Sequence, residues 1–341
     1  MNLKAILQRP WSPFLAGPPT PGGRFDVTAK DGLRLALHRV HPEGAPGPAV
    51  LLLHGLAANR HGFNFPGRSL AVHLASRGFD CFIPELRGEG ESERPSYRWR
   101  IDDYLRYDLP AFLETIQRVT GRDEIHWIGH SMGGILLFCW GMLHPEIKIQ
   151  SGITIGSALD YRVGDSGYRW MLPLKPYLAP VPVLPYGTLI HWLAPALGHG
   201  LSHRLEAFNA WPENLEPEMM RRLHAICFHA VPISLLLSLS TLFDDSGLQL
   251  EDGTRVLDHV KSYSVPTLLL GGSRDPQAPP VAVEHAAKLL SSPTTVRVFG
   301  RDYGEPEDYG HFDLIIGKRA PQEVWPVLTD WLERHRAGSP R

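Results

Sequence analysis

The chain has 341 residues, of which 43% are hydrophobic, and a formal net charge of -2. This length can bury a large core, either as one α/β domain or as a core with an inserted region. The near-neutral charge gives no basic surface field and no run of Lys and Arg occurs, so we expect no nucleic-acid partner.

Cysteine usage and the amino-terminal sequence indicate the compartment. Three cysteines (Cys81, Cys139 and Cys227) are too few for a disulfide framework, and two of them lie in apolar segments. Residues 1–23 are rich in Pro and lack the long apolar run of a secretion signal, and no Asn precedes a Ser or Thr by two positions. We therefore expect a cytoplasmic protein.

The rest of the chain alternates between strand and helix patterns. Arg24 to Val27 and Leu33 to Val40 flank Lys30-Asp31-Gly32, which is typical of a hairpin. Apolar runs then predict strands over 48–53, 79–83, 124–128, 149–155, 266–270 and 295–299, and helices over 68–76, 102–119, 132–143, 281–290 and 321–335, the second of them interrupted by Pro110. Such alternation indicates a mostly parallel sheet flanked by helices.

Residues 157–263 break this alternation and are rich in Trp, Pro, Leu and His. We predict a helical cap, or lid, that covers the site and lines an apolar acyl pocket; the alternative is an ordinary subdomain packed on the core. The core is then 24–156 with 264–341, preceded by the Pro-rich segment 1–23. Within the predicted cap, residues 225–243 lack charge over a membrane span's length, but Pro232, His229 and serines argue against stable insertion and leave only interfacial contact open.

A nucleophile is predicted at Ser131. The sequence Gly129-His130-Ser131-Met132-Gly133 matches Gly-x-Ser-x-Gly and stands between a predicted strand and a predicted helix. In a nucleophile elbow the serine sits on a sharp, strained strand-to-helix turn, and the glycines allow close approach of the neighbouring chain. The alternative is that Ser131 only caps the helix that follows.

A serine nucleophile needs a base, an acid and donors for the oxyanion. His311 follows the last predicted strand and is our candidate base, and Asp275 follows the strand 266–270 and is our candidate acid, with Asp160 as its rival. The oxyanion donors are expected to be the backbone N–H groups of Met132, at the helix start, and of Leu56, after His54-Gly55. His54 and His130 are interpreted as structural neighbours.

These motifs resemble serine α/β-hydrolases, in particular the lipase and esterase branch that includes the acid (gastric-type) lipases. The resemblance spans roughly residues 48–160 and 264–336, and it rests on His54-Gly55-Leu56, Leu86-Arg87-Gly88, Tyr107-Asp108-Leu109-Pro110-Ala111, the Ser131 pentapeptide, Tyr309-Gly310-His311-Phe312-Asp313-Leu314 and Ala320-Pro321-Gln322-Glu323-Val324. It implies an eight-stranded core, carboxylic ester hydrolysis and a triad carried by Ser131, His311 and Asp275. One departure is Met132, where acid lipases usually have Gln.

We therefore predict an α/β-hydrolase fold with an inserted cap and a serine hydrolase that cleaves small-molecule carboxylic esters with an apolar acyl group. An acyltransferase or a peptidase with the same triad remains an alternative, as does a non-catalytic binding protein. No organic cofactor is expected. No metal is expected either, although His199 and His203 are four residues apart with Glu206 nearby, because no further ligand is evident. The sequence leaves the oligomeric state open.

Overall fold

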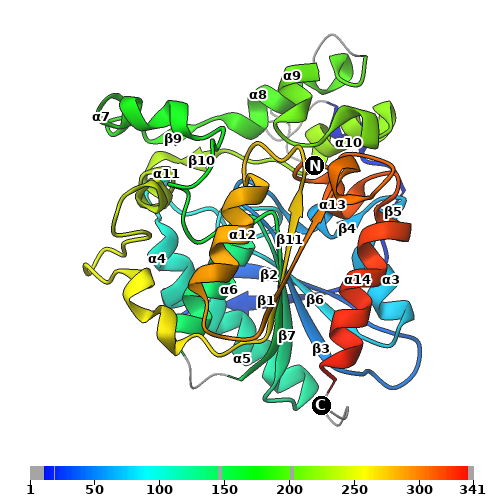
Figure 1. The fold of residues 1–341 in the computed structure, drawn as a ribbon. Helices are drawn as coiled ribbons and strands as arrows, with labels where there is room; N and C mark the ends of the chain where they lie inside the picture. Colours follow the sequence, from blue (N-terminus) through cyan, green and yellow to red (C-terminus); the bar gives the residue numbers. More distant parts are fainter. Residues whose placement is uncertain (1–10, 19, 145–147, 200–202, 337–341) are drawn as a thin grey trace.

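An eight-stranded sheet forms the centre of the protein in the computed structural model, which describes residues 11–18, 20–144, 148–199 and 203–336 (Figure 1). Its spatial order is β1-β2-β6-β3-β7-β8-β11-β12. The strands are β1 (Gly23–Thr28), β2 (Arg34–Val40), β3 (Ala49–Leu53), β6 (Asp80–Glu85), β7 (Ile125–His130), β8 (Ile149–Ile155), β11 (Thr267–Gly272) and β12 (Thr294–Phe299). Only the β1–β2 and β2–β6 pairs are antiparallel, so the predicted mostly parallel sheet is confirmed.

The sequence of each central strand explains its position. All residues of β3, β6, β7 and β11 are buried, as expected for apolar runs covered on both faces of a parallel sheet. At the edge, β1 and β2 form the predicted hairpin, in which Thr28 pairs with Arg34 and Gly32 takes a φ of 85°. This positive φ is open to glycine at little cost.

Helices cover both faces of the sheet (Figure 1). They are α3 (Leu70–Ser76), α4 (Ile101–Asp103), α5 (Leu109–Thr120), α6 (Met132–Leu143), α12 (Pro280–Leu289), α13 (Asp313–Ile316) and α14 (Ala320–Arg334). The predicted helix 102–119 is divided, because a π-helical stretch, Tyr104–Asp108, separates α4 from α5. Pro110 lies in the first turn of α5, directly after this π-helical stretch.

The inserted region, residues 157–263, is built from short elements. They include the 3₁₀ helix η3 (Arg169–Leu174), α7 (Lys175–Leu178), β9 (Val183–Leu184), α8 (Tyr186–Leu193), α9 (His203–Ala207), α10 (Pro217–Ile226), β10 (Val231–Pro232), α11 (Ile233–Leu239), the 3₁₀ helix η6 (Ser240–Phe243) and the 3₁₀ helix η7 (Val256–Ser262). Figure 1 shows α7, α8, α9 and α10 gathered at one end of the sheet. By contrast, η7 packs against α6 on the side of the core.

The uncharged stretch 225–243 is not one long helix. It comprises the end of α10, the two-residue strand β10, α11 and η6. In the part of the chain that the structure describes, no helix is both long enough and apolar enough to cross a membrane. Near the amino terminus, the one-turn helix α2 (Ser12–Leu15) packs against α10.

Candidate active site

Ser131 occupies a sharp turn between β7 and α6. Its φ of 53° and ψ of -119° lie in a region that residues with a side chain rarely adopt, and its N–H donates to the Ile155 carbonyl at 2.9 Å. Ser131 is the residue that precedes α6, but in the described part of the chain its side chain accepts no hydrogen bond from the helix. The alternative interpretation of Ser131 as an ordinary side-chain cap is therefore wrong.

The glycines around Ser131 permit this turn. A Cβ at Gly129 would overlap the Gly133 carbonyl, and a Cβ at Gly133 would overlap the Leu53 carbonyl at the end of β3. A Cβ at Gly55 would lie 2.8 Å from the Ser131 Cβ. Larger residues would push the turn away from the neighbouring strand ends, as the elbow pattern predicts.

His311 and Asp275 form a buried pair on two neighbouring loops. His311 Nδ1 lies 2.7 Å from Asp275 Oδ2, and their side chains are 1% and 0% exposed. The other oxygen, Asp275 Oδ1, accepts from the N–H groups of Gln277 at 2.8 Å and Ala278 at 3.0 Å. A carboxylate held in this way orients the imidazole so that Nε2 is left to face other groups.

Ser131 and His311 line one cavity. No hydrogen bond joins the serine hydroxyl to the imidazole within the described ranges, although both side chains border the same space. Contacts of this kind are often long in the absence of substrate and shorten when substrate binds. The chain order of the three residues is Ser, Asp, His, and they follow β7, β11 and β12 at one edge of the sheet.

The rival acid, Asp160, lies elsewhere. It is buried, but its carboxylate pairs with Arg162 at 2.7 Å and faces His285 Nε2 at 3.4 Å. The structure therefore brings Asp275, and not Asp160, against His311.

The two predicted oxyanion donors flank Ser131. Met132 is the first residue of α6, and Leu56 follows β3 in a loop where Ala57 takes a φ of 58°. Among the described residues, neither backbone N–H donates a hydrogen bond. The Ala57 carbonyl accepts from the His229 N–H at 2.7 Å, so the inserted region holds this loop.

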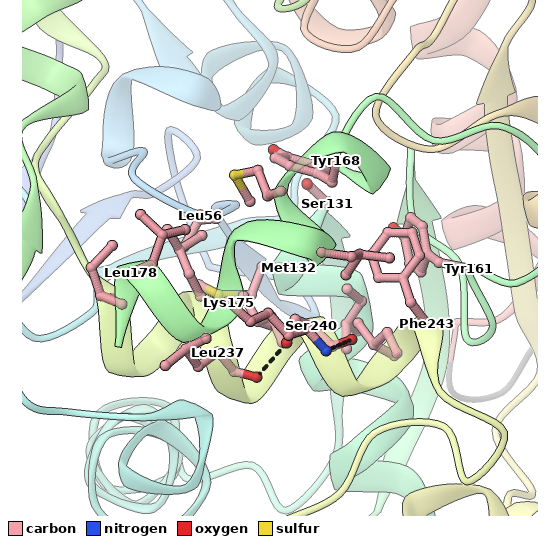
Figure 2. Close-up of a pocket in the computed structure, with 17 residues that line it drawn as sticks. Leu56, Ser131, Met132, Tyr161, Tyr168, Lys175, Leu178, Leu237, Ser240 and Phe243 are labelled. Atoms are coloured by element: carbon pink, nitrogen blue, oxygen red, sulfur yellow. Dashed lines mark hydrogen bonds between the residues drawn. The ribbon is translucent and has the colours of Figure 1, made fainter. Parts of the chain in front are cut away.

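The cavity at Ser131 has two arms, which share Leu56, Ser131, Tyr168, Met171 and Leu236. The wall of the first arm includes Met132, Leu178 and Phe243, and most of it is aliphatic (Figure 2). The second arm contains His311. Mostly apolar walls with a few polar groups are typical of small-molecule sites.

Comparisons with known proteins agree with this geometry. A family model described as the alpha/beta hydrolase fold matches residues 48–183. The human protein named Lipase member K is 26% identical over 92% of this chain and 88% of its own length, and mouse gastric triacylglycerol lipase is 32% identical over 47% of this chain and 46% of its own. This chain has the α/β-hydrolase fold.

Solved structures of an esterase and of a lipase share this fold. An esterase from Thermogutta terrifontis has a TM-score of 0.63 at 18% identity, covering 92% of this hydrolase and all of the esterase. A monoacylglycerol lipase from Paleococcus ferrophilus has a TM-score of 0.62 at 18% identity, covering 88% and 99%. The predicted fold class is thus confirmed.

His54 and His130 are buried next to the site, and His130 also borders the second arm of the cavity. Burial lowers the pKa of both imidazoles, so each is neutral near pH 7. His54 Nε2 accepts from the Leu86 N–H at 3.2 Å, and its Nδ1 faces the Gly55 carbonyl at 2.9 Å. The ring of His130 packs on that of His311, with centroids 4.5 Å apart.

Sequence reasoning missed several residues that position the site. Ser157 donates to the Ser131 carbonyl at 2.8 Å. Buried Asp313 accepts from the N–H groups of Gly310 at 3.0 Å and Trp211 at 2.9 Å, and burial raises its pKa to about 6. Asp313 belongs to the same sequence motif as His311, but the sequence does not indicate its positioning role, because its partner Trp211 is about a hundred positions away.

Residues of two other motifs pair with each other. Arg87 and Asp108 form a buried ion pair at 2.6 Å, and the Arg87 N–H also donates to Asp108 at 2.9 Å. The two motifs lie apart in the sequence, and their spacing alone does not show that they meet.

The weak metal candidate in the inserted region has other contacts. His203 Nε2 faces Glu213 at 3.0 Å, and Glu206 accepts from the Gly198 N–H at 2.6 Å. Within the described ranges, no group of three or more His, Cys, Asp or Glu side chains could hold a metal ion.

Proposed function

We propose that this carboxylic ester hydrolase acts through an acyl-enzyme formed on Ser131. The Ser131 hydroxyl attacks the ester carbonyl while His311 Nε2 takes its proton, and His311 then gives that proton to the departing alcohol. Water then attacks the acyl-enzyme while His311 takes a proton from it, and His311 returns that proton to Ser131 as the carboxylic acid leaves. Asp275 keeps His311 in the required tautomer and stabilises the imidazolium that forms.

The oxyanion of each tetrahedral intermediate is assigned to the backbone N–H groups of Met132 and Leu56. Both residues border the cavity next to Ser131, and Met132 adds the positive end of the α6 dipole. Preorganised donors in a site shielded from water are the largest single contribution in many such reactions.

The observation that carries this proposal is the convergence of two features on one apolar cavity. Ser131 stands at positive φ on the elbow, and His311, held by buried Asp275, borders the same space. A structural serine and an ordinary ion pair would not require either the strained turn or a shared cavity.

The inserted region is proposed to be the predicted cap and to act as a lid over this site. Only residues 157–243 would cover the site, because η7, later in the region, packs against α6 of the core. Neither η3 nor α7 has a buried residue, yet Leu172 and Leu178 of these elements form a cavity wall. A wall so lightly packed can move aside, and its aliphatic side chains favour apolar acyl groups. A cytoplasmic location remains a prediction.

Labelling with a fluorophosphonate tests the nucleophile. The protein is expected to be labelled and to cleave aryl esters, and Ser131→Ala is expected to lose both properties with its circular dichroism unchanged. Ser76→Ala, at an exposed serine on α3, is the matched control and should retain both. Equal labelling of Ser131→Ala would refute the proposal. Labelling without ester turnover would point instead to acyl transfer or amide cleavage by the same residues.

A further inference from the structure

The two arms of the cavity differ in chemistry. Beyond the residues that they share, the first arm is mostly aliphatic: its wall includes Ile135, Leu178, Ile233, Leu237, Leu239 and Leu242. The wall of the second arm includes Trp170, Tyr186, Phe208, Phe228 and Phe312. We call these the aliphatic arm and the aromatic arm.

The reaction assigns one half of an ester to each arm, an inference that rests on the proposed function. His311 must reach the leaving oxygen to protonate it, so the alcohol half lies on the side that His311 lines, which is the aromatic arm. The acyl half stays on Ser131 with its oxyanion at the Met132 N–H. It therefore extends along the aliphatic arm, whose wall includes Met132 and Ile135.

Ring pairs in the aromatic arm meet edge to face. Tyr168 and Phe208 have centroids 5.4 Å apart at 83°, and Phe228 meets Tyr186 at 5.5 Å and 78° and Phe312 at 5.3 Å and 84°. In an edge-to-face pair, each ring covers only part of the other. The remaining faces and edges can pack against a further aromatic ring in the same edge-to-face geometry.

Four polar side chains of the aromatic arm, those of Tyr168, Gln277, Tyr186 and Asn209, have hydrogen-bond partners within the protein. Tyr168 donates to Gln277 Oε1 at 2.5 Å, and Gln277 Nε2 donates to the Phe208 carbonyl at 2.8 Å. Tyr186 donates to Asn209 Oδ1 at 2.9 Å, and the Asn209 amide faces His224 Nε2 at 3.1 Å.

His224 keeps this network in one arrangement. Burial lowers its pKa to about 4, so it is neutral at physiological pH, and its Nδ1 faces the Met220 carbonyl at 2.8 Å. The hydroxyl protons of Tyr168 and Tyr186 are already engaged, so a polyhydroxylated alcohol such as glycerol finds few free donors in this arm for its several oxygens, which is unfavourable.

We propose that the preferred substrates carry an aromatic ring in the alcohol half and an aliphatic chain in the acyl half, as in aralkyl esters of fatty acids. Phe208 is then a residue that determines specificity for the alcohol, and Phe243, in the wall of the aliphatic arm, determines specificity for the acyl chain. Both side chains are partly exposed, which makes them a matched pair.

Three octanoate esters test the alcohol preference: those of 2-phenylethanol, 2-cyclohexylethanol and glycerol. The first two alcohols have similar size and acidity, so their difference reports the aromatic ring alone. We expect kcat/KM to be roughly 3- to 10-fold higher for the phenyl than for the cyclohexyl ester, and roughly 10- to 100-fold higher than for the glycerol ester.

Variants assign the arms. Phe208→Ala is expected to remove the preference for phenyl over cyclohexyl and to leave the dependence on acyl length unchanged. Phe243→Ala is expected to change the dependence on acyl length and to leave the preference for phenyl over cyclohexyl unchanged. Phe208→Leu retains an apolar side chain at this position and should also lose the phenyl preference, which covers the case in which Phe208→Ala does not fold.

Each outcome separates this inference from the proposed function. Equal cleavage of all three esters, abolished by Ser131→Ala, would overturn the aromatic preference and leave the mechanism standing. A change in acyl preference caused by Phe208→Ala would overturn the arm assignment. No cleavage of any ester together with no labelling of Ser131 would refute the proposed function itself.

Discussion

The sheet and the inserted region hold the cavity in different ways. Strands β3, β7, β8 and β11 are almost entirely buried, and short loops after three of them carry Leu56, Ser131 and Asp275. The inserted region contributes short helices, and two of them, η3 and α7, have no buried residue. The difference indicates that the core fixes the reacting groups, whereas the inserted region shapes the space around the substrate.

The outer side of the inserted region sharpens this contrast. Tyr177 is 77% exposed, and even Trp170, which borders the aromatic arm, is 66% exposed. These side chains gain little free energy from burial in the structure. Substitutions in the core should therefore change the rate of the chemical step, and substitutions in the inserted region should change the choice of substrate.

The largest effect is expected at Asp275. Asp275→Asn removes the carboxylate that orients His311, and kcat should fall by roughly 10⁴-fold. Asp160→Asn is the matched control, because this buried carboxylate also follows a strand but pairs with Arg162. It should change kcat by less than roughly 10-fold, as measured with a soluble aryl ester. A greater loss in Asp160→Asn would reverse the assignment of the acid.

Gly156→Ala tests how tightly the core holds the acid and the base. Gly156 takes a φ of 59°, and a Cβ there would lie 2.9 Å from both Asp275 Oδ2 and His311 Nδ1. A displacement of this pair should lower kcat by roughly 10²-fold. Gly253→Ala has a similar φ of 87° with no atom near the new Cβ, so it matches the backbone strain and should leave kcat unchanged. Equal kcat values in the two variants would mean that the pair tolerates movement.

Glu85 provides a test of core stability through pH. Burial by itself would raise its pKa, but the hydrogen bond with His38 and the charge of Arg60 outweigh burial and lower the pKa to about 2. Because this pKa is below the unfolded value of 4.5, the stabilisation is present above pH 4.5 and is lost as the pH falls toward 2.

The lost free energy of unfolding is at most roughly 3 kcal/mol. Between pH 5 and pH 3, the free energy of unfolding measured in urea should fall less for Glu85→Gln than for the unsubstituted protein. Glu124→Gln, at a half-exposed carboxylate paired with Lys148, should follow the unsubstituted protein. Parallel curves for Glu85→Gln and the unsubstituted protein would contradict this source of acid sensitivity.

The smallest effect is expected in the inserted region. Leu178→Ala enlarges the aliphatic arm and should change kcat/KM for decanoate esters by roughly 10-fold while acetate esters react as before. Leu189→Ala, at a residue that is 55% exposed and outside both arms, should leave the acyl-length profile unchanged. If Leu178→Ala slowed all esters equally, this part of the inserted region would contribute to the chemical step as well.

The sequence by itself determined the local features. Apolar runs placed the strands, the Asp-Gly turn placed the hairpin, and the glycine pattern placed Ser131 at the elbow, because each of these depends on the backbone preferences of a few consecutive residues. The helix over 102–119, predicted with an interruption at Pro110, is divided instead at the π-helical stretch Tyr104–Asp108, just before that proline.

Only the tertiary structure decided which residues meet. Asp160 and Asp275 both follow strands, and their separation from His311 depends on the order of β8, β11 and β12 in the sheet. The aromatic arm likewise joins Phe208, Phe228 and Phe312, which no local pattern connects. Contacts between distant segments follow from the path of the whole chain, and so the two arms and their chemistry became visible only in the folded protein.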